Sequence, residues 1–239
     1  MNRLFLALLL TAATACSGAA ESPTVMMAPS AVTAPGSPPP SALPAATARY
    51  RVVFDSTWTR STHPQDAPDN PHYSALIGVT HHSGVTFWLP GSPATEGIRR
   101  MAESGVNLAL DTEIRAAIAS AAAKDLLLGS TLDSPGTTSF EFEVSQTHPL
   151  VTLVTMVAPS PDWFVGVSGL PMFENGAWIE QRVMPLAPWD AGTDSGATFR
   201  AADIDTRPRQ PISLISTPPL AINGTVSPLG IFTFMRLGS

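Results

Sequence analysis

Three aspartates in two turn-rich segments are the residues whose type and spacing best suit metal chemistry. Asp162 follows a Pro-Ser-Pro corner, and Asp190 and Asp194 lie in the glycine-punctuated segment 188–196. Proline and glycine at these places break helical and strand periodicity, which predicts a loop in both segments. A hard cation such as Ca²⁺ takes six to eight oxygen ligands, and loops offer carboxylates together with unpaired backbone carbonyls. The pattern therefore predicts one Ca²⁺ held by Asp162, Asp190 and Asp194.

The same aspartates also fit ordinary turn chemistry. An aspartate beside glycine or proline commonly accepts a hydrogen bond from a backbone N–H group two residues further along. Each aspartate taken alone fits this interpretation at least as well, and only their joint occurrence favours the metal. The sequence leaves both interpretations open.

Composition limits the classes of partner. The chain has 239 residues, a formal net charge of −6 and only 13% charged residues. Its largest basic cluster is the isolated pair Arg99-Arg100, and its only lysine is Lys124. Nucleic-acid binding proteins carry basic patches or stripes, so nucleic acid is excluded as a partner. The length suits one large all-β domain or two small ones.

The N-terminus reads as an export signal over residues 1–16. Arg3 precedes a short apolar run at 4–13, which is too short to span a bilayer. The following Ala-Thr-Ala-Cys resembles the lipobox of bacterial lipoproteins, which predicts that Cys16 is acylated and anchors the chain to the membrane of the cell envelope, most simply the outer membrane or cell surface. The alternative is ordinary signal cleavage that removes Cys16, the only cysteine of the chain.

Residues 17–47 form a spacer in this interpretation. The segment consists mostly of Ala, Ser, Thr and Pro, carries one charge at Glu21, and contains three consecutive prolines at 38–40. Such a segment has little to bury and is expected to be extended and disordered. The folded domain is expected at 48–239.

The rest of the chain predicts a mainly β fold, because short apolar stretches with period-two alternation are separated by proline and glycine turns. We expect strands at 49–58, 75–81, 85–89, 139–144, 150–157, 163–167, 178–184, 197–200, 212–215 and 231–237. Two helices interrupt them. One is expected at 96–104, stopped by Gly105, and the other at 112–127, with Asp111 as N-cap. This order is typical of an antiparallel β-sandwich with a short helical insertion.

Several motifs together resemble a known family. They are His63-Pro64, Pro-His-Tyr-Ser-Ala-Leu-Ile-Gly at 71–78, Ala-Thr-Glu-Gly-Ile at 94–98, His-Pro-Leu at 148–150, Pro-Ser-Pro-Asp-Trp-Phe-Val-Gly at 159–166 and Pro-Trp-Asp-Ala-Gly-Thr-Asp-Ser-Gly at 188–196. The chain resembles the spondin N-terminal domain, the F-spondin/mindin module, over residues 48–237. The last two motifs are long and unusual, which makes the resemblance specific.

The resemblance implies a C2-like antiparallel β-sandwich with an extracellular adhesion role. It also implies a calcium site on the aspartates of the last two motifs, which are Asp162, Asp190 and Asp194 here. Animal members carry further cysteines within the domain, whereas this chain has none after Cys16. The expected function is a non-enzymatic, lipid-anchored surface module that binds an unidentified extracellular protein or glycan.

An enzymatic alternative rests on a histidine-rich stretch. The clustered histidines could join Asp66 and Asp69 in a transition-metal site or act as a general base; they are His63, His72, His81 and His82. Such a site would make the protein a metal-dependent hydrolase of envelope polymers. No HExxH or Cys/His spacing supports this alternative. A hydrolase requires the histidine nitrogens to reach a shared ion.

Glu141 and Glu143 are a second possible catalytic pair. They alternate with phenylalanines, which is typical of the solvent face of a strand rather than of a glycosidase pair.

Overall fold

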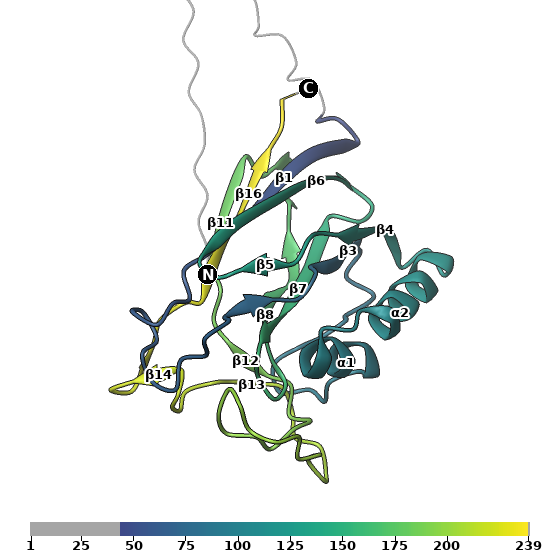
Figure 1. Cartoon of the computed structure of the whole chain (residues 1–239). Helices are drawn as coiled ribbons and strands as arrows, with labels where there is room; N and C mark the ends of the chain where they lie inside the picture. The colour runs from purple at the N-terminus through teal and green to yellow at the C-terminus, as the bar shows by residue number, and fades with distance from the viewer. Residues whose placement is uncertain (1–43, 239) are drawn as a thin grey trace, which may run out of the picture. The chain divides into compact units, whose positions relative to one another are not determined.

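The computed structural model describes residues 44–238 (Figure 1). The predicted signal segment 1–16, with Cys16, and residues 17–43 of the predicted spacer lie outside the described residues. Within residues 44–238, no helix is both long enough and apolar enough to cross a membrane.

Alternating burial along the first strand shows how the sequence builds the fold. In β1 (Thr47–Ser56), Tyr50, Val52 and Phe54 are buried while Arg49 and Arg51 are exposed. Successive side chains of a strand point to opposite faces of the sheet, so this period-two pattern turns one face of β1 toward the core. The strand predicted at 49–58 is confirmed, but it both begins and ends two residues earlier.

Two antiparallel sheets form the sandwich (Figure 1). The smaller sheet has the order β11 (Gln181–Pro185), β16 (Gly230–Arg236), β1 and β6 (Gly136–Ser145). The larger sheet has the order β13 (Ser213–Leu214), β12 (Trp189–Asp190), β8 (Trp163–Pro171), β7 (Leu150–Ala158), β2 (His72–Tyr73) and β5 (Leu132–Asp133), and β3 (Ile77–His81) also pairs with β7 and with β4 (Ala123–Leu128). Two short hairpins complete the strands: β9 (Phe173–Glu174) with β10 (Ala177–Trp178), and β14 (Ala221–Ile222) with β15 (Thr225–Val226).

The central strand β7 is buried on both faces. Val151 and Leu153 belong to the core between the two sheets, together with the apolar side chains of β1 and β16. Val154 and Met156 belong to a second core, which the two helices share. The C2-like β-sandwich is therefore confirmed, with the helices as a third layer on the larger sheet.

The helix predicted at 96–104 is confirmed as α1 (Glu96–Ser104). Its N-cap is Thr95, whose side-chain oxygen accepts a hydrogen bond from the backbone N–H of Ile98 at 3.1 Å. Gly105 ends the helix in the left-handed region at φ 67°, which glycine adopts without steric cost.

The helix predicted at 112–127 is wrong in both bounds. The observed α2 (Leu108–Ala119) begins a turn earlier, with Asn107 rather than Asp111 at the N-cap position. The segment after Ala121, where the backbone reaches φ 56°, becomes β4 and pairs with β3. Pairing with β3 therefore overrides the helical propensity of an Ala- and Leu-rich segment.

Two predicted strands are absent from the described fold. Phe87 and Trp88, in the segment 85–89, are buried in the second core without joining a ladder. Phe199, in the segment 197–200, is buried against Trp58 with its rings 5.2 Å apart. In both segments the buried aromatic side chains fill the core from loops. The strand predicted at 178–184 is divided between β10 and β11.

The last residues of the predicted spacer contact the sandwich. The carbonyl of Ala45 accepts hydrogen bonds from the indole of Trp178 at 2.9 Å and from the side chain of Gln146 at 3.0 Å. The carbonyl of Ala46 accepts one from the backbone N–H of Gln146. The folded domain thus begins a few residues before residue 48, where the sequence predicted its start.

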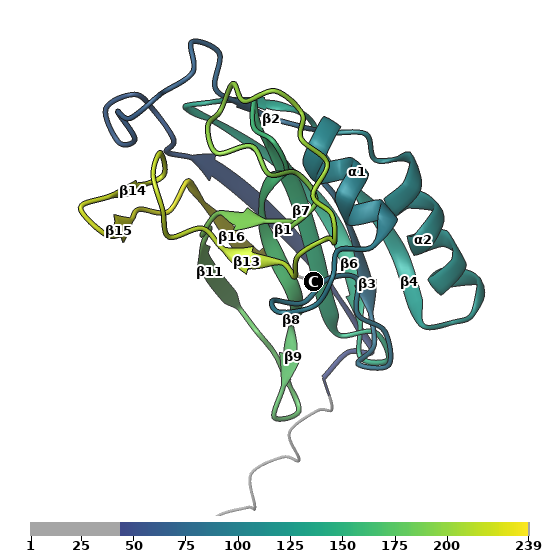
Figure 2. The ribbon, with the colours of Figure 1, turned by 90° about the horizontal axis from the view of Figure 1, so that it is seen from below.

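The connection from β12 to β13 determines where the candidate site lies. Figure 2 shows this yellow-green segment folding back beside α1. Backbone hydrogen bonds tie it to itself: the N–H of Thr206 donates to Thr193, that of Ser195 to Ile204, and that of Gln210 to Gly192. The aspartate turn at its start is therefore held by the chain that returns across it.

Candidate metal site in the aspartate turns

Asp162 joins the two predicted turns. Its side chain is fully buried immediately before β8, and its Oδ2 accepts hydrogen bonds from the backbone N–H groups of Thr193 at 2.7 Å and of Asp194 at 3.0 Å. The Thr193 hydroxyl donates to the same oxygen at 3.1 Å. The structure therefore brings Asp162 against the second aspartate segment, which lies next to β8 because β12 pairs with it.

The other carboxylate oxygen of Asp162 has no partner among residues 44–238. Oδ1 is buried and accepts no hydrogen bond. Leaving a buried charged oxygen unpaired is costly in free energy. Burial raises the pKa of Asp162 to about 6, and the negative charge of Asp190 acts in the same direction. The site thus has a deficit of positive charge, which a bound cation would remove.

Asp190 and Asp194 make local turn contacts. Oδ1 of Asp190 accepts from the backbone N–H of Gly192, and Oδ1 of Asp194 accepts from that of Gly196, each at 2.7 Å. The second oxygen of Asp194 accepts from the N–H of Ile204 at 2.9 Å. Burial raises the pKa of Asp190, an effect that the Gly192 N–H partly offsets. The turn interpretation holds for both residues, and it is compatible with a cation because each carboxylate oxygen has two lone pairs.

Glycine is required at position 192. Its φ is +73°, and a β-carbon there would lie 2.1 Å from the carbonyl oxygen of Gln210. The backbone N–H of Gln210 donates to the carbonyl of Gly192 at 2.8 Å, which fixes this close approach. The turn between Asp190 and Asp194 can therefore form only because the residue has no side chain.

The donor set is suited to a hard cation but is incomplete by itself. Carboxylate oxygens are the ligands that Ca²⁺ prefers, and the unpaired Oδ1 of Asp162 fits a cation at this place. Across residues 44–238, no three His, Cys, Asp or Glu side chains are already arranged to hold a metal. A cation would need backbone carbonyls or water as further ligands. The assignment of Asp162, Asp190 and Asp194 to one Ca²⁺ stays a prediction.

Comparison with known proteins decides the family. A family model described as Spondin_N matches residues 48–221, most of the described domain. The chain belongs to the spondin N-terminal domain family. The family membership predicted from the motifs is thereby confirmed, and both aspartate segments lie inside the matched range.

Two relatives of this spondin domain are animal proteins. Spondin-2 of Rattus norvegicus is 35% identical over 204 residues, which cover 80% of this chain and 62% of the relative. Spondin-1 of Homo sapiens is 36% identical over 173 residues, which cover 70% of this chain and 21% of the relative. The chain thus spans less than two thirds of the length of these relatives.

The histidines predicted for the hydrolase site have separate partners in the spondin domain, and the ring of His82 stacks on that of His148 with centroids 5.7 Å apart. His63 is buried, and its ring nitrogens lie near the Thr62 hydroxyl and the Ser227 carbonyl. Burial lowers the pKa of His63. Nδ1 of His72 lies 2.8 Å from the Asn70 carbonyl.

The remaining members of the predicted histidine site have partners of their own. His81 lies between the His82 carbonyl and the Thr152 hydroxyl. Asp66 accepts from the backbone N–H of Phe199, and Asp69 pairs with two arginines. The shared ion that a hydrolase requires therefore has no site built from these residues.

Glu141 and Glu143 lie on the solvent face, as predicted. Glu141 pairs with Arg49 and Arg51 at 2.6 Å, and Glu143 pairs with Lys124 at 2.9 Å. Ion pairs across neighbouring strands account for both glutamates.

Sequence reasoning missed an arginine-lined groove beside the aspartate turn. Arg99 and Arg100 on α1 face Arg207 and Arg209 of the β12–β13 connection, and Asp194 lies in the same wall. The sequence shows the pair Arg99-Arg100 as the largest basic cluster. It does not show that this pair lies close to Arg207 and Arg209, more than 100 positions further along the chain.

Proposed function

We propose that the chain is an exported spondin domain that binds an extracellular protein or glycan, is anchored to the cell envelope through acylated Cys16, and uses Ca²⁺ to hold its aspartate turns. Membership in the spondin family supports the binding role. The separate hydrogen-bond partners of His63, His72 and His81 favour this role over a hydrolase built on them.

The single observation that carries the calcium proposal is the buried, unpaired Oδ1 of Asp162. A cation there would neutralise the charges of Asp162 and Asp190 and would link the start of β8 to the segment after β12. The ion would supply charge and coordination only. The chain itself orients the carboxylates through the N–H groups of Gly192, Thr193 and Asp194.

Calcium is expected to stabilise the folded domain by mass action. Extracellular Ca²⁺ modules commonly have dissociation constants of about 10⁻⁴ to 10⁻³ M, so ~2 mM Ca²⁺ should add roughly 0.6–1.8 kcal/mol to the free energy of unfolding. For a domain of this size the melting temperature should rise by about 1–7 °C. Thermal melts of the wild type in EGTA and in Ca²⁺ measure this shift, with Mg²⁺ as control because it demands octahedral geometry at shorter distances.

The matched variant is Asp190→Asn. It keeps a side-chain oxygen for the Gly192 N–H but removes one charge, so it should lose the Ca²⁺ response while costing the protein little in EGTA. The metal proposal fails if the melting temperature of the wild type is the same in EGTA and in Ca²⁺ and elemental analysis finds no retained calcium.

The anchor proposal predicts a change of location for Cys16→Ala. Because acyl chains contribute about 0.8 kcal/mol per buried CH₂, the wild type should sediment with membranes. The variant should accumulate as unprocessed precursor or appear in the soluble fraction. A variant that is processed and partitions as the wild type does would contradict acylation at Cys16. Fractionation followed by mass spectrometry of the mature N-terminus measures both outcomes.

A further inference from the structure

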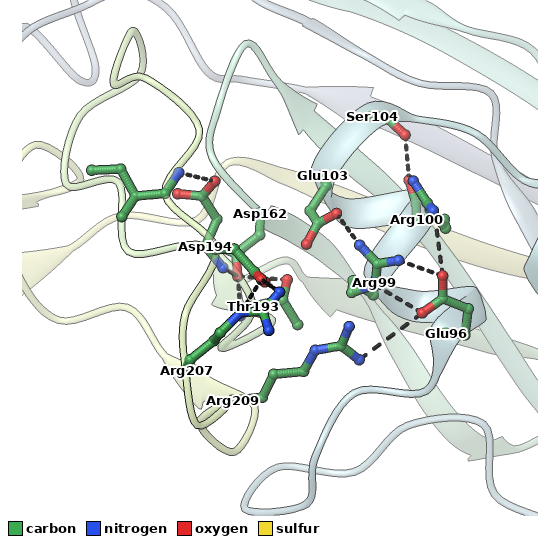
Figure 3. Close-up of polar contacts among 12 residues, drawn as sticks. Glu96, Arg99, Arg100, Glu103, Ser104, Asp162, Thr193, Asp194, Arg207 and Arg209 are labelled. Carbon is green, nitrogen blue, oxygen red and sulfur yellow. Dashed lines mark hydrogen bonds and ion pairs between the residues drawn. The ribbon is translucent and has the colours of Figure 1, made fainter.

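A charged groove lies between α1 and the β12–β13 connection. Its volume is about 400 Å³, and it opens to solvent. Figure 3 shows Arg99 and Arg100 reaching from the helix, with Arg207 and Arg209 on the opposite side. A hollow of this volume suits a small ligand or one or two units of a polymer.

Three guanidinium groups gather around one carboxylate, Glu96. Arg99 donates from Nε to Oε2 of Glu96 at 2.8 Å, Arg100 donates from Nε to Oε1 at 3.0 Å, and Nη1 of Arg209 lies 3.9 Å from Oε2. The hydrogen bond from Arg99 is the largest cause that lowers the pKa of Glu96 to about 2, and Arg100 adds to it. The pKa of this exposed carboxylate is low because guanidinium groups donate hydrogen bonds to its charged form.

Two of these arginines retain free donors. Arg99 is only 14% exposed and is fully engaged by Glu96 and Glu103. Arg100 and Arg209 are 53% and 43% exposed. Within residues 44–238, the terminal nitrogens of Arg100 donate no hydrogen bond and Arg209 makes only the long contact with Glu96. A guanidinium presents a planar fork of N–H groups that matches a carboxylate or sulfate.

The acidic side chains of the groove limit what can bind. Glu103 pairs with Arg99, Asp205 pairs with Arg207, and both oxygens of Asp194 accept backbone N–H groups. Asp203 is exposed and has no ion pair within the described residues. The groove is therefore close to neutral as a whole, which disfavours a dense polyanion. It offers directional donors for one anionic group beside acceptors for hydroxyl groups.

We infer that this groove binds an acidic saccharide, with a carboxylate or sulfate of the sugar bound by the free N–H groups of Arg100 and Arg209 and its hydroxyl groups bound to carboxylates of the groove, including Asp203. The inference rests on the proposed binding function and names its ligand class. A concave, hydroxyl-matching groove favours a saccharide over an acidic peptide.

Titration calorimetry of the mature full-length protein tests this inference with trigalacturonate, a sulfated trisaccharide and a neutral trisaccharide. Either acidic probe should bind, and the neutral one should bind at least about tenfold more weakly, because charge-assisted hydrogen bonds are roughly twice as strong as neutral ones. Arg100→Gln and Arg209→Gln should each lower the affinity for the acidic probe by about tenfold. Arg209→Lys should lower it by less, because lysine keeps the charge but not the planar fork. Substitution of these exposed side chains should leave folding intact.

The matched control is Arg115→Gln. Arg115 is exposed on α2, pairs with Asp111 and lies outside the groove. Loss of the Arg115 guanidinium should not change the affinity for the acidic sugars. Three results would overturn the inference. The neutral sugar could bind as tightly as the acidic sugars, neither acidic sugar could bind at millimolar concentration, or the acidic peptide triglutamate could bind more tightly than both acidic sugars. The Ca²⁺-dependent melting shift is read separately, so failure of the groove and failure of the calcium proposal are distinguishable.

Discussion

Gly192→Ala is expected to destabilise the domain by about 3 kcal/mol, because left-handed backbone strain adds to a clash that only a backbone shift can relieve. The new β-carbon would lie 2.1 Å from the Gln210 carbonyl oxygen. Relief of the clash would disrupt the hydrogen bond between Gln210 and Gly192 and, with it, the turn that carries Asp190 and Asp194. Urea unfolding midpoints at unchanged m-value measure the loss.

Gly224→Ala is the matched control for backbone strain. Gly224 has nearly the same φ, +76°, but no atom lies within 4 Å of the position that a β-carbon would take there. Only the left-handed strain remains, which costs about 1 kcal/mol. Equal losses in the two variants would mean that the close approach at Gly192 does not hold the aspartate turn.

In EGTA, the ionisation of Asp162 is expected to lower the stability of the folded protein as pH rises from about 4 to 6. The folded-state pKa is raised from 3.8 to about 6, so the folded state binds more protons than the unfolded state in this window. Stability falls with pH wherever the folded state binds more protons. The whole shift corresponds to about 3 kcal/mol, of which about 2 kcal/mol should be lost between pH 4 and pH 6. Denaturant unfolding across this pH range measures the slope.

Asp162→Asn isolates this contribution. The variant keeps an oxygen for the Thr193 and Asp194 N–H groups but cannot ionise. Burial lowers the pKa values of His63 and His81, which makes stability rise with pH in both proteins. The contribution of Asp162 is therefore the difference in stability between wild type and variant at each pH. The variant should be the more stable protein at pH 7 in EGTA. Asp133→Asn, at an exposed site, is the control for the loss of one aspartate charge.

Calcium should partly offset the pH trend of the wild type. Protons and the ion compete for the carboxylates, so the stabilisation by Ca²⁺ should grow as pH rises through the pKa of Asp162. If the stability of the wild type and of Asp162→Asn changes with pH in the same way in EGTA, the pKa of the buried Asp162 carboxyl is not raised in the folded state.

Local sequence signals determined much of the fold. The alternation of Tyr50, Val52 and Phe54 predicted β1, and Gly105 marked the end of α1, because strand and helix periods and a left-handed C-cap are local properties. The two aspartate motifs identified the family and their own turns. The turns at Asp190 and Asp194 form through N–H groups only two residues away, so they too were predictable.

Long-range contacts decided the rest. Residues 123–128 have a composition that favours a helix, yet they form β4 because β3, over 40 positions earlier, supplies a ladder. The contact of Asp162 with Thr193 and the meeting of Arg99 with Arg209 across the groove likewise depend on how the sheet places distant segments. The sequence by itself determined the family, the sandwich and the three candidate ligands. Only the tertiary structure decided which carboxylate oxygen is left buried without a partner and which arginines share a groove, because burial and proximity depend on the packing of the whole chain.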